Sequence, residues 1–273
     1  MDTKQKQIAA VAVVVIIIIA AVAVYFATKD KDNGGDDEGS TVTFLIQDNY
    51  GVYFWVEGQG ETVYDAFKDA VSDYSMPFEA STDSSGVETG IQSLFGLAMT
   101  ETSSGWLWWT QYSYTDGAWS TNYSYMTGLA ASENPYVAVV YGDGTVTPTV
   151  TPSDAEVWDK DTDGIVFTVQ SPSGMYFKIN GNGSDAMSAW EVAYVNYNID
   201  SEAEEVSGGA WITSIFTLDT PSDYSSYWAV YVVENGTWTY ATSYLTGMTP
   251  SEYSSILLVY TVNGETPELP PVA

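Results

Sequence analysis

Three residue types with distinctive chemistry are missing from this chain of 273 residues: it has no cysteine, no histidine and no arginine. The absence of cysteine excludes disulfides, thiolate metal sites, a thiol nucleophile and a lipid-modified cysteine anchor. The absence of histidine removes the commonest general base and the commonest transition-metal ligand. Catalysis would have to use carboxylates, hydroxyls and a few lysines, so we predict that the protein is not an enzyme.

Positive charge is also scarce, because 36 acidic residues stand against 7 lysines and the formal net charge is -29. Such a chain repels phosphate backbones and anionic lipid surfaces, and we predict no nucleic-acid partner. Hydrophobic residues make up 45% of the chain, which is enough to build folded cores.

One long apolar run stands near the N-terminus, from Ile8 to Ala27. A helix of about 20 residues is about 30 Å long, which matches the hydrocarbon core of a bilayer. We predict a transmembrane helix here, with the rest of the chain outside the cell, as a single-pass protein of the cell membrane. A cleaved signal peptide is the alternative, since Ala21-Val22-Ala23 resembles a cleavage site, and a pilin-type leader is a third option.

An internal repeat organises the rest of the chain. The segment VTFLIQDNYGVYFWVEGQG from Val42 aligns with IVFTVQSPSGMYFKINGNG from Ile165. Further on, DGAWSTNYSYMTG from Asp116 aligns with NGTWTYATSYLTG from Asn235 at nearly the same separation. The insertions between the copies are therefore small and fall in loops. The predicted parts are an anchor or signal sequence (1–27), an acidic linker (28–40), the first repeat (41–142), a linker rich in Thr, Pro and Asp (143–163), the second repeat (164–262) and a tail (263–273).

The same order of elements is expected in both repeats: a β-hairpin, a helix, a polar loop and further strands. The hairpin strands are expected at Val42–Gln47 and Val52–Glu57, and at Ile165–Gln170 and Met175–Asn180. Asp116-Gly117 and Asn235-Gly236 lie between aromatic, β-branched segments and predict type I′ turns. One helix packed on one mixed sheet predicts the α+β class, with two tandem β-grasp-like domains after the N-terminal transmembrane helix.

This pattern resembles the transcobalamin C-terminal-like domain family. The motifs are ITSIFTL, after Gly208, and YWAVYVVENG, from Tyr227, in the second repeat, and GIQSLFGLA, from Gly90, and WWTQYSYTDG, from Trp108, in the first. The resemblance covers both repeats and implies binding of a corrinoid such as cobalamin, which this domain caps in the vitamin B12 carriers. The helical partner domain of those carriers has no counterpart here, and no histidine is present to serve as an axial ligand.

Aromatic residues are concentrated in GWLWWTQYSY of the first repeat, where alternate residues of a strand share one face. A solvent-facing aromatic strip can stack on a planar or sugar-like ligand. The alternative is that these rings pack under a loop or against the other domain. The ligand-binding candidates are Trp106, Trp108, Tyr112 and Tyr114 in this strand and Tyr227 and Tyr231 in the equivalent strand of the second repeat.

A candidate calcium site is formed by Asp159, Asp161 and Asp163, which precede Gly164 with the spacing of a calcium-loop opening. The twelfth position holds Gln170 instead of a bidentate glutamate. The alternative is a solvated acidic linker.

These features predict a membrane-anchored extracytoplasmic binding protein that takes a corrinoid, another planar small molecule or a cell-surface ligand. The rival hypothesis is a structural or adhesive envelope protein that makes protein–protein contacts. A glycosidase-like enzyme is the third class, because Glu202, Glu204 and Glu205 offer paired carboxylates. They fall in a predicted loop without a flanking aromatic cluster, which argues against that class.

Overall fold

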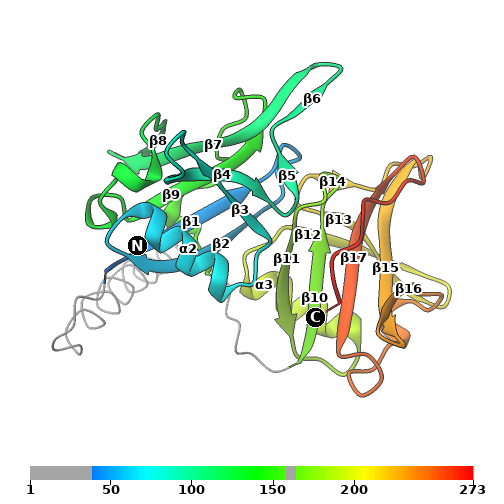
Figure 1. Ribbon diagram of the computed structural model, residues 1–273. Coiled ribbons are helices and arrows are strands. Elements are labelled where there is room, and N and C mark those ends of the chain that lie inside the picture. The colour runs from blue at the N-terminus through cyan, green and yellow to red at the C-terminus, as the bar shows by residue number, and fades with distance from the viewer. Residues whose placement is uncertain (1–38, 158–163, 273) are drawn as a thin grey trace, which may run out of the picture. The chain divides into compact units, whose positions relative to one another are not determined.

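Two large sheets and two small ones make up the described part of the chain, residues 39–157 and 164–272 of the computed structural model (Figure 1). We call 39–157 the N-terminal half and 164–272 the C-terminal half. The N-terminal sheet has the order β2 (Tyr53–Gly60), β1 (Ser40–Gln47), β9 (Tyr136–Gly142), β7 (Gly105–Thr115) and β6 (Thr100–Thr102), with β8 (Ala118–Thr121) paired to β7. The C-terminal sheet has the order β11 (Tyr176–Gly181), β10 (Ile165–Gln170), β17 (Ser255–Val262), β15 (Ser226–Glu234) and β16 (Thr237–Tyr240).

Each half also contains a small three-stranded sheet. These sheets are β3 (Phe78–Thr82), β4 (Glu88–Leu94) and β5 (Leu97–Ala98) in the N-terminal half, and β12 (Ser201–Val206), β13 (Gly209–Ile215) and β14 (Leu218–Asp219) in the C-terminal half. Short 3-10 turns occur at Met126–Gly128, Ala131–Glu133, Pro152–Asp154 and Leu245–Gly247.

The strand pairing of the two large sheets is the same. β1 is antiparallel to β2 and parallel to β9, and β10 is antiparallel to β11 and parallel to β17. Both predicted first hairpins are therefore confirmed. The predicted type I′ turns are confirmed as well, because both central residues have positive φ: 54° and 81° at Asp116-Gly117, and 52° and 76° at Asn235-Gly236.

One helix lies against each large sheet: α2 (Val63–Asp73) and α3 (Ala186–Asn196). Each is capped at its N-terminus, by Thr62 and by Asp185. The helices approach the strands at glycines that the repeat preserves. A Cβ built on Gly58 would lie 2.0 Å from the Ala66 carbonyl oxygen, and one on Gly181 would lie 1.9 Å from the Ala189 carbonyl oxygen. These glycines therefore permit the close packing of helix on strand.

The predicted α+β class, with two tandem β-grasp-like domains, is wrong. The described residues form 17 strands in four sheets and only two α-helices, so the protein is mostly β. The error lies in the segments that follow the helices. They were expected to be polar loops, yet they hold β3 and β12, which pair with β4 and β13 to make the two small sheets.

The predicted membrane anchor, Ile8–Ala27, lies outside the described residues. Among residues 39–157 and 164–272, no helix is long and apolar enough to cross a bilayer.

A segment that follows each large sheet packs back onto it; we call residues 143–157 and 263–272 the trailing segments. Gln47 is fully buried, donates to the Thr147 carbonyl oxygen (3.0 Å) and accepts from the Thr149 backbone N–H (2.9 Å). The indole N–H of Trp119 donates to the Val150 carbonyl oxygen at 2.7 Å. Leu45, Trp55 and Tyr112 form a buried cluster with apolar residues of the same segment. Residues 143–157, which were expected to form a linker, thus cover one face of the N-terminal sheet.

The C-terminal half repeats this arrangement with equivalent residues. Gln170 donates to the Glu268 carbonyl oxygen at 2.7 Å, and the Trp238 indole donates to the Pro270 carbonyl oxygen at 2.8 Å. The expected tail, 263–273, is therefore attached to the C-terminal sheet over its described residues.

Equivalent aromatic residues of the two halves meet each other. Phe54 stacks on Phe177, its match in the repeat, with ring centroids 5.4 Å apart and planes 19° apart. Tyr53 contacts Phe216 at 4.9 Å, and the equivalent pair, Tyr176 and Phe95, is 5.0 Å apart. One continuous cluster of buried apolar residues includes side chains from both halves.

Candidate functional site

A large cleft lies in the C-terminal half, between the small sheet and the edge of the large sheet. Its volume is about 740 Å³, within the range of small-molecule sites. One wall is formed by β12 and β13, another by β15, and the chain after β16 completes it. The lining residues are Glu204, Val206, Ala210, Trp211, Tyr224, Tyr227, Trp228, Val230, Tyr240, Ala241, Thr242, Ser243, Tyr244 and Leu245.

Aromatic rings dominate this C-terminal cleft. Trp211 and Tyr224 lie side by side with centroids 5.7 Å apart and planes 31° apart. Tyr244 packs on the β12–β13 turn, where a Cβ built on Gly209 would lie 2.6 Å from the Tyr244 Cβ. The glycine turn therefore lets the Tyr244 ring approach the cleft. Trp228 is a buried lining residue, and its indole N–H donates to the Leu218 carbonyl oxygen at 2.9 Å.

Glu204 is the only charged residue of the described chain that lines the cleft. Burial, with the nearby hydroxyls of Tyr227 and Tyr231, raises the pKa of Tyr240 above its ordinary value, so this phenol stays protonated near neutral pH. The cleft thus presents neutral aromatic faces and hydroxyls with a single negative charge. Such a lining suits a ligand with a flat or apolar surface.

A smaller cleft of about 240 Å³ lies at the equivalent place in the N-terminal half. The strand pairing makes the correspondence explicit, since Glu204 pairs with Trp211 on β12–β13 and Ser81 pairs with Gly90 on β3–β4. The lining residues are Ser81, Thr89, Gly90, Ile91, Trp109, Thr110, Gln111, Ser124, Tyr125, Met126 and Val139. This N-terminal cleft therefore has serine and glycine where the C-terminal cleft has glutamate and tryptophan.

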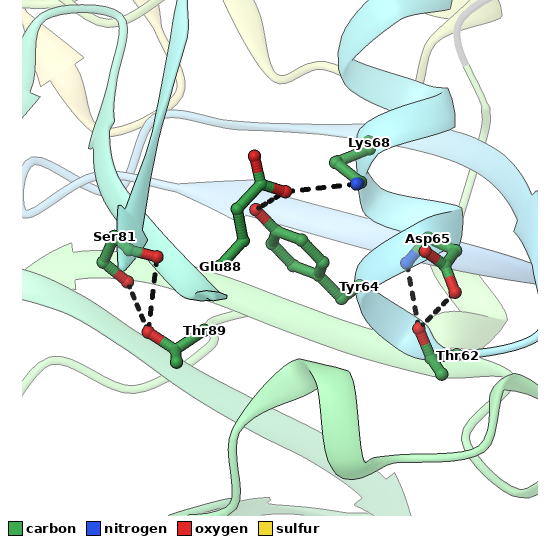
Figure 2. A network of polar contacts seen from close by, with 7 residues as sticks. All are labelled: Thr62, Tyr64, Asp65, Lys68, Ser81, Glu88 and Thr89. Carbon is green, nitrogen blue, oxygen red and sulfur yellow. Dashed lines mark hydrogen bonds and ion pairs between the residues drawn. The ribbon is translucent and has the colours of Figure 1, made fainter. Parts of the chain in front are cut away.

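The polar groups of the N-terminal cleft are mostly satisfied within the protein. The hydroxyls of Ser81 and Thr89 lie 3.1 Å apart and hydrogen-bond across β3–β4, as Figure 2 shows. In the same view Glu88 accepts from Tyr64 and pairs with Lys68, which ties β4 to α2. These contacts lower the pKa of Glu88, with Lys68 as the larger cause. The exceptions are Thr110 and Gln111, whose buried Oγ1 and Nε2 have no hydrogen-bond partner among the described residues.

No family model, curated protein or solved structure matches the chain. The resemblance to the transcobalamin C-terminal-like family therefore stays a prediction from the motifs of the sequence.

The four residues of the predicted aromatic strip in the first repeat differ in their exposure to solvent. Trp106 and Trp108 are 47% and 36% exposed on β7. Tyr112 is only 3% exposed, and its hydroxyl donates to the Val146 carbonyl oxygen at 2.9 Å. Tyr114 packs edge-on against Trp119 at 5.0 Å. The trailing segment covers this end of the strip, so Tyr112 is not accessible to a ligand.

The two candidates of the second repeat lie closer to a cleft. Tyr227 lines the C-terminal cleft directly. Tyr231 packs edge-on against Tyr240, a lining residue, with ring centroids 5.6 Å apart.

The calcium candidates Asp159, Asp161 and Asp163 lie outside the described residues. In the part of the chain that the structure describes, no group of three or more acidic side chains is placed to hold a metal ion.

Sequence reasoning missed four aromatic residues of the C-terminal cleft: Trp211, Tyr224, Tyr240 and Tyr244. A signal for one of them was present in the repeat, because Trp211 stands where the first copy has Gly90.

Proposed function

We propose that the protein is an extracytoplasmic binding protein whose C-terminal cleft holds a small molecule with a flat or apolar surface. The observation that carries the proposal is the concentration of Trp211, Tyr224, Tyr227, Tyr240 and Tyr244 around one cleft of about 740 Å³. The apolar run Ile8–Ala27 supports the assignment to the outer face of a cell membrane. A corrinoid is the first specific ligand to test, since the resemblance of both repeats implies it.

The proposal is tested with N-phenyl-1-naphthylamine, a neutral ring compound that fluoresces in apolar sites, added to the full-length protein. We expect saturable binding of one molecule per chain, weakened at least about tenfold in Trp211→Gly, which installs the residue of the N-terminal cleft. Trp106→Ala is the matched control, because Trp106 is an exposed tryptophan of β7 that does not line the cleft. This variant is expected to leave binding unchanged. Binding that does not saturate, or that Trp211→Gly leaves intact, would overturn the proposal.

The corrinoid is tested separately by displacing the bound probe with cyanocobalamin. Saturable displacement at micromolar concentrations supports a corrinoid ligand. Saturable probe binding that cyanocobalamin does not displace removes the corrinoid and leaves the binding function in place.

The alternative function is structural or adhesive, and exposed apolar residues near β6 and β7 favour it. Met99, just before β6, is 65% exposed, and Trp106 on the neighbouring strand β7 is 47% exposed. An adhesive surface of this kind predicts self-association or attachment to a partner that Trp106→Ala weakens and Trp211→Gly does not.

A further inference from the structure

We propose that the ligand of the C-terminal cleft is an organic cation, which the cleft recognises by a quaternary ammonium group. This inference rests on the proposed function, because it names the chemical class of the ligand for the same cleft.

The rings of the cleft supply the first part of the argument. The face of an aromatic ring carries partial negative charge and attracts a cation that lies over it. Trp211 and Tyr224 form a continuous aromatic surface, and the rings of Tyr227, Tyr240 and Tyr244 line the remaining sides. A quaternary ammonium group has no N–H, so it needs ring faces instead of hydrogen-bond acceptors.

The charged side chains around the cleft also favour a cationic ligand. Among the described residues, Glu204 is the only charged residue that lines the cleft. The lysines of the described residues are Lys68 and Lys178, and neither lines the cleft. Lys68 pairs with Glu88 in the other half, while Lys178 lies on β11, at the opposite edge of the sheet from β16. No cationic side chain of the described residues therefore competes for the rings.

The charge of the whole chain acts in the same direction. A net charge of -29 attracts cations toward the surface and repels anionic ligands. An anionic ring compound would also meet Glu204 without a compensating cation in the cleft.

The N-terminal cleft supplies an internal comparison. It has the same walls but carries Ser81 and Gly90 at the positions of Glu204 and Trp211. Of the two clefts, only the C-terminal one thus has the features proposed to bind a cation. Glu204→Ser and Trp211→Gly would remove them by installing residues that the same fold already holds in the N-terminal cleft.

The test compares choline with 3,3-dimethyl-1-butanol, which has the same shape but a carbon in place of the charged nitrogen. Each is titrated into the full-length protein by isothermal calorimetry. We expect choline to bind about tenfold more tightly than the neutral compound, and the difference to shrink as salt screens the charge. Equal affinity for the two compounds would overturn the cation inference while leaving the binding function intact.

Four variants locate the effect. Glu204→Ser is expected to weaken choline binding and to leave 3,3-dimethyl-1-butanol unchanged. Glu205→Gln is the matched control, since Glu205 follows Glu204 on β12 and does not line the cleft; it leaves both affinities unchanged. Trp211→Phe keeps a ring and retains the preference for choline, whereas Trp211→Gly abolishes it.

The remaining outcomes separate this inference from the function on which it rests. If neither compound binds while N-phenyl-1-naphthylamine does, the ligand is a neutral ring and the cation inference is overturned. If N-phenyl-1-naphthylamine also fails to bind, the proposed function falls with it.

Discussion

Gln111 and Val230 occupy equivalent positions in the two clefts, and they differ in polarity. The Gln111 Nε2 is buried without a partner, whereas Val230 has no polar atom to satisfy. A buried donor without a partner lowers stability by about 1–3 kcal/mol. The amide of Gln111 is therefore retained at a cost to the free energy of unfolding.

Replacing Gln111 by valine is expected to raise the free energy of unfolding by about 1 kcal/mol, because the unpartnered N–H disappears. Urea denaturation measures the change, with an unaltered m-value as the sign that the native state is the same. The reciprocal change, Val230→Gln, places an amide among apolar side chains and is expected to lower stability by about 1–3 kcal/mol. A loss of stability in Gln111→Val would show that the amide has a partner in solution.

Asp48 is the fully buried carboxylate of the N-terminal half. It accepts from the backbone N–H groups of Tyr50 (2.9 Å) and Val52 (3.0 Å), and from the hydroxyl of Ser173 (2.7 Å). Burial raises its pKa above the ordinary 3.8, and these hydrogen bonds oppose the rise. The folded protein therefore holds this proton more tightly than the unfolded chain does.

A raised pKa in the folded state contributes stability that is present below the unfolded pKa and is lost as pH rises through the folded pKa. Asp48→Asn keeps an acceptor oxygen but cannot ionise. The melting temperature of the variant is therefore expected to rise relative to that of the wild type as pH increases from about 4 to about 8. Melting curves of both proteins across this range measure the difference. Because the other carboxylates are common to both, parallel curves would contradict a raised pKa at Asp48.

At the scale of elements, the trailing segments are held by side chains of the sheets that they cover. Gln47→Leu removes the partners of the Thr147 carbonyl and the Thr149 N–H, so we expect a loss of about 2 kcal/mol or more. Hydrogen exchange at the Thr149 amide should become faster. Gln170→Leu is the matched variant, because it frees the equivalent segment at Glu268 instead. Unchanged exchange at Thr149 in Gln47→Leu would mean that Trp119 and the apolar contacts hold the segment without Gln47.

The elements that the sequence predicted correctly carry strong local signals. Turns such as Asp116-Gly117 require positive φ, and α2 begins with a capping residue followed by apolar residues at helical spacing. The strand β12 has no such signal. Its sequence, SEAEEV, is acidic. The two end residues are half-buried and the four between them are exposed, as is common in an edge strand. The sequence therefore predicts a loop here, and the predicted fold class is wrong for this reason.

The same omission concealed most of the C-terminal cleft. Trp211 belongs to β13, and its position in a cleft wall depends on pairing with Glu204 of β12. Tyr227 was predicted because the alternation of strand residues is a local property. Tyr224 and Tyr244 come from loops, whose position depends on tertiary contacts such as the approach of Gly209 to Tyr244.

At the scale of the whole molecule, the aromatic contacts between the halves determine how the chain unfolds. Phe54, Phe177 and Phe216 belong to one buried cluster that extends through both halves. We expect the two halves to unfold in a single cooperative transition, with tryptophan fluorescence and far-UV circular dichroism giving the same midpoint.

Phe177→Ala removes the ring that stacks on Phe54 and is expected to cost about 3–5 kcal/mol. If the halves are coupled as described, both spectroscopic signals shift together to lower urea concentration. Two separate transitions, with only one of them displaced, would show that the halves unfold independently.

The trailing segments also affect the order in which the chain can fold during synthesis. Trp55 and Trp119 are covered by Val150 and Val157, which are translated after the last strand of their own sheet. A nascent chain that has emerged only as far as Gly142 would expose these rings. The ribosome must add fifteen further residues before the rings of the N-terminal half can be covered. The N-terminal half can therefore complete its fold only once Val157 has been synthesised. A fragment that ends at Gly142 is expected to aggregate.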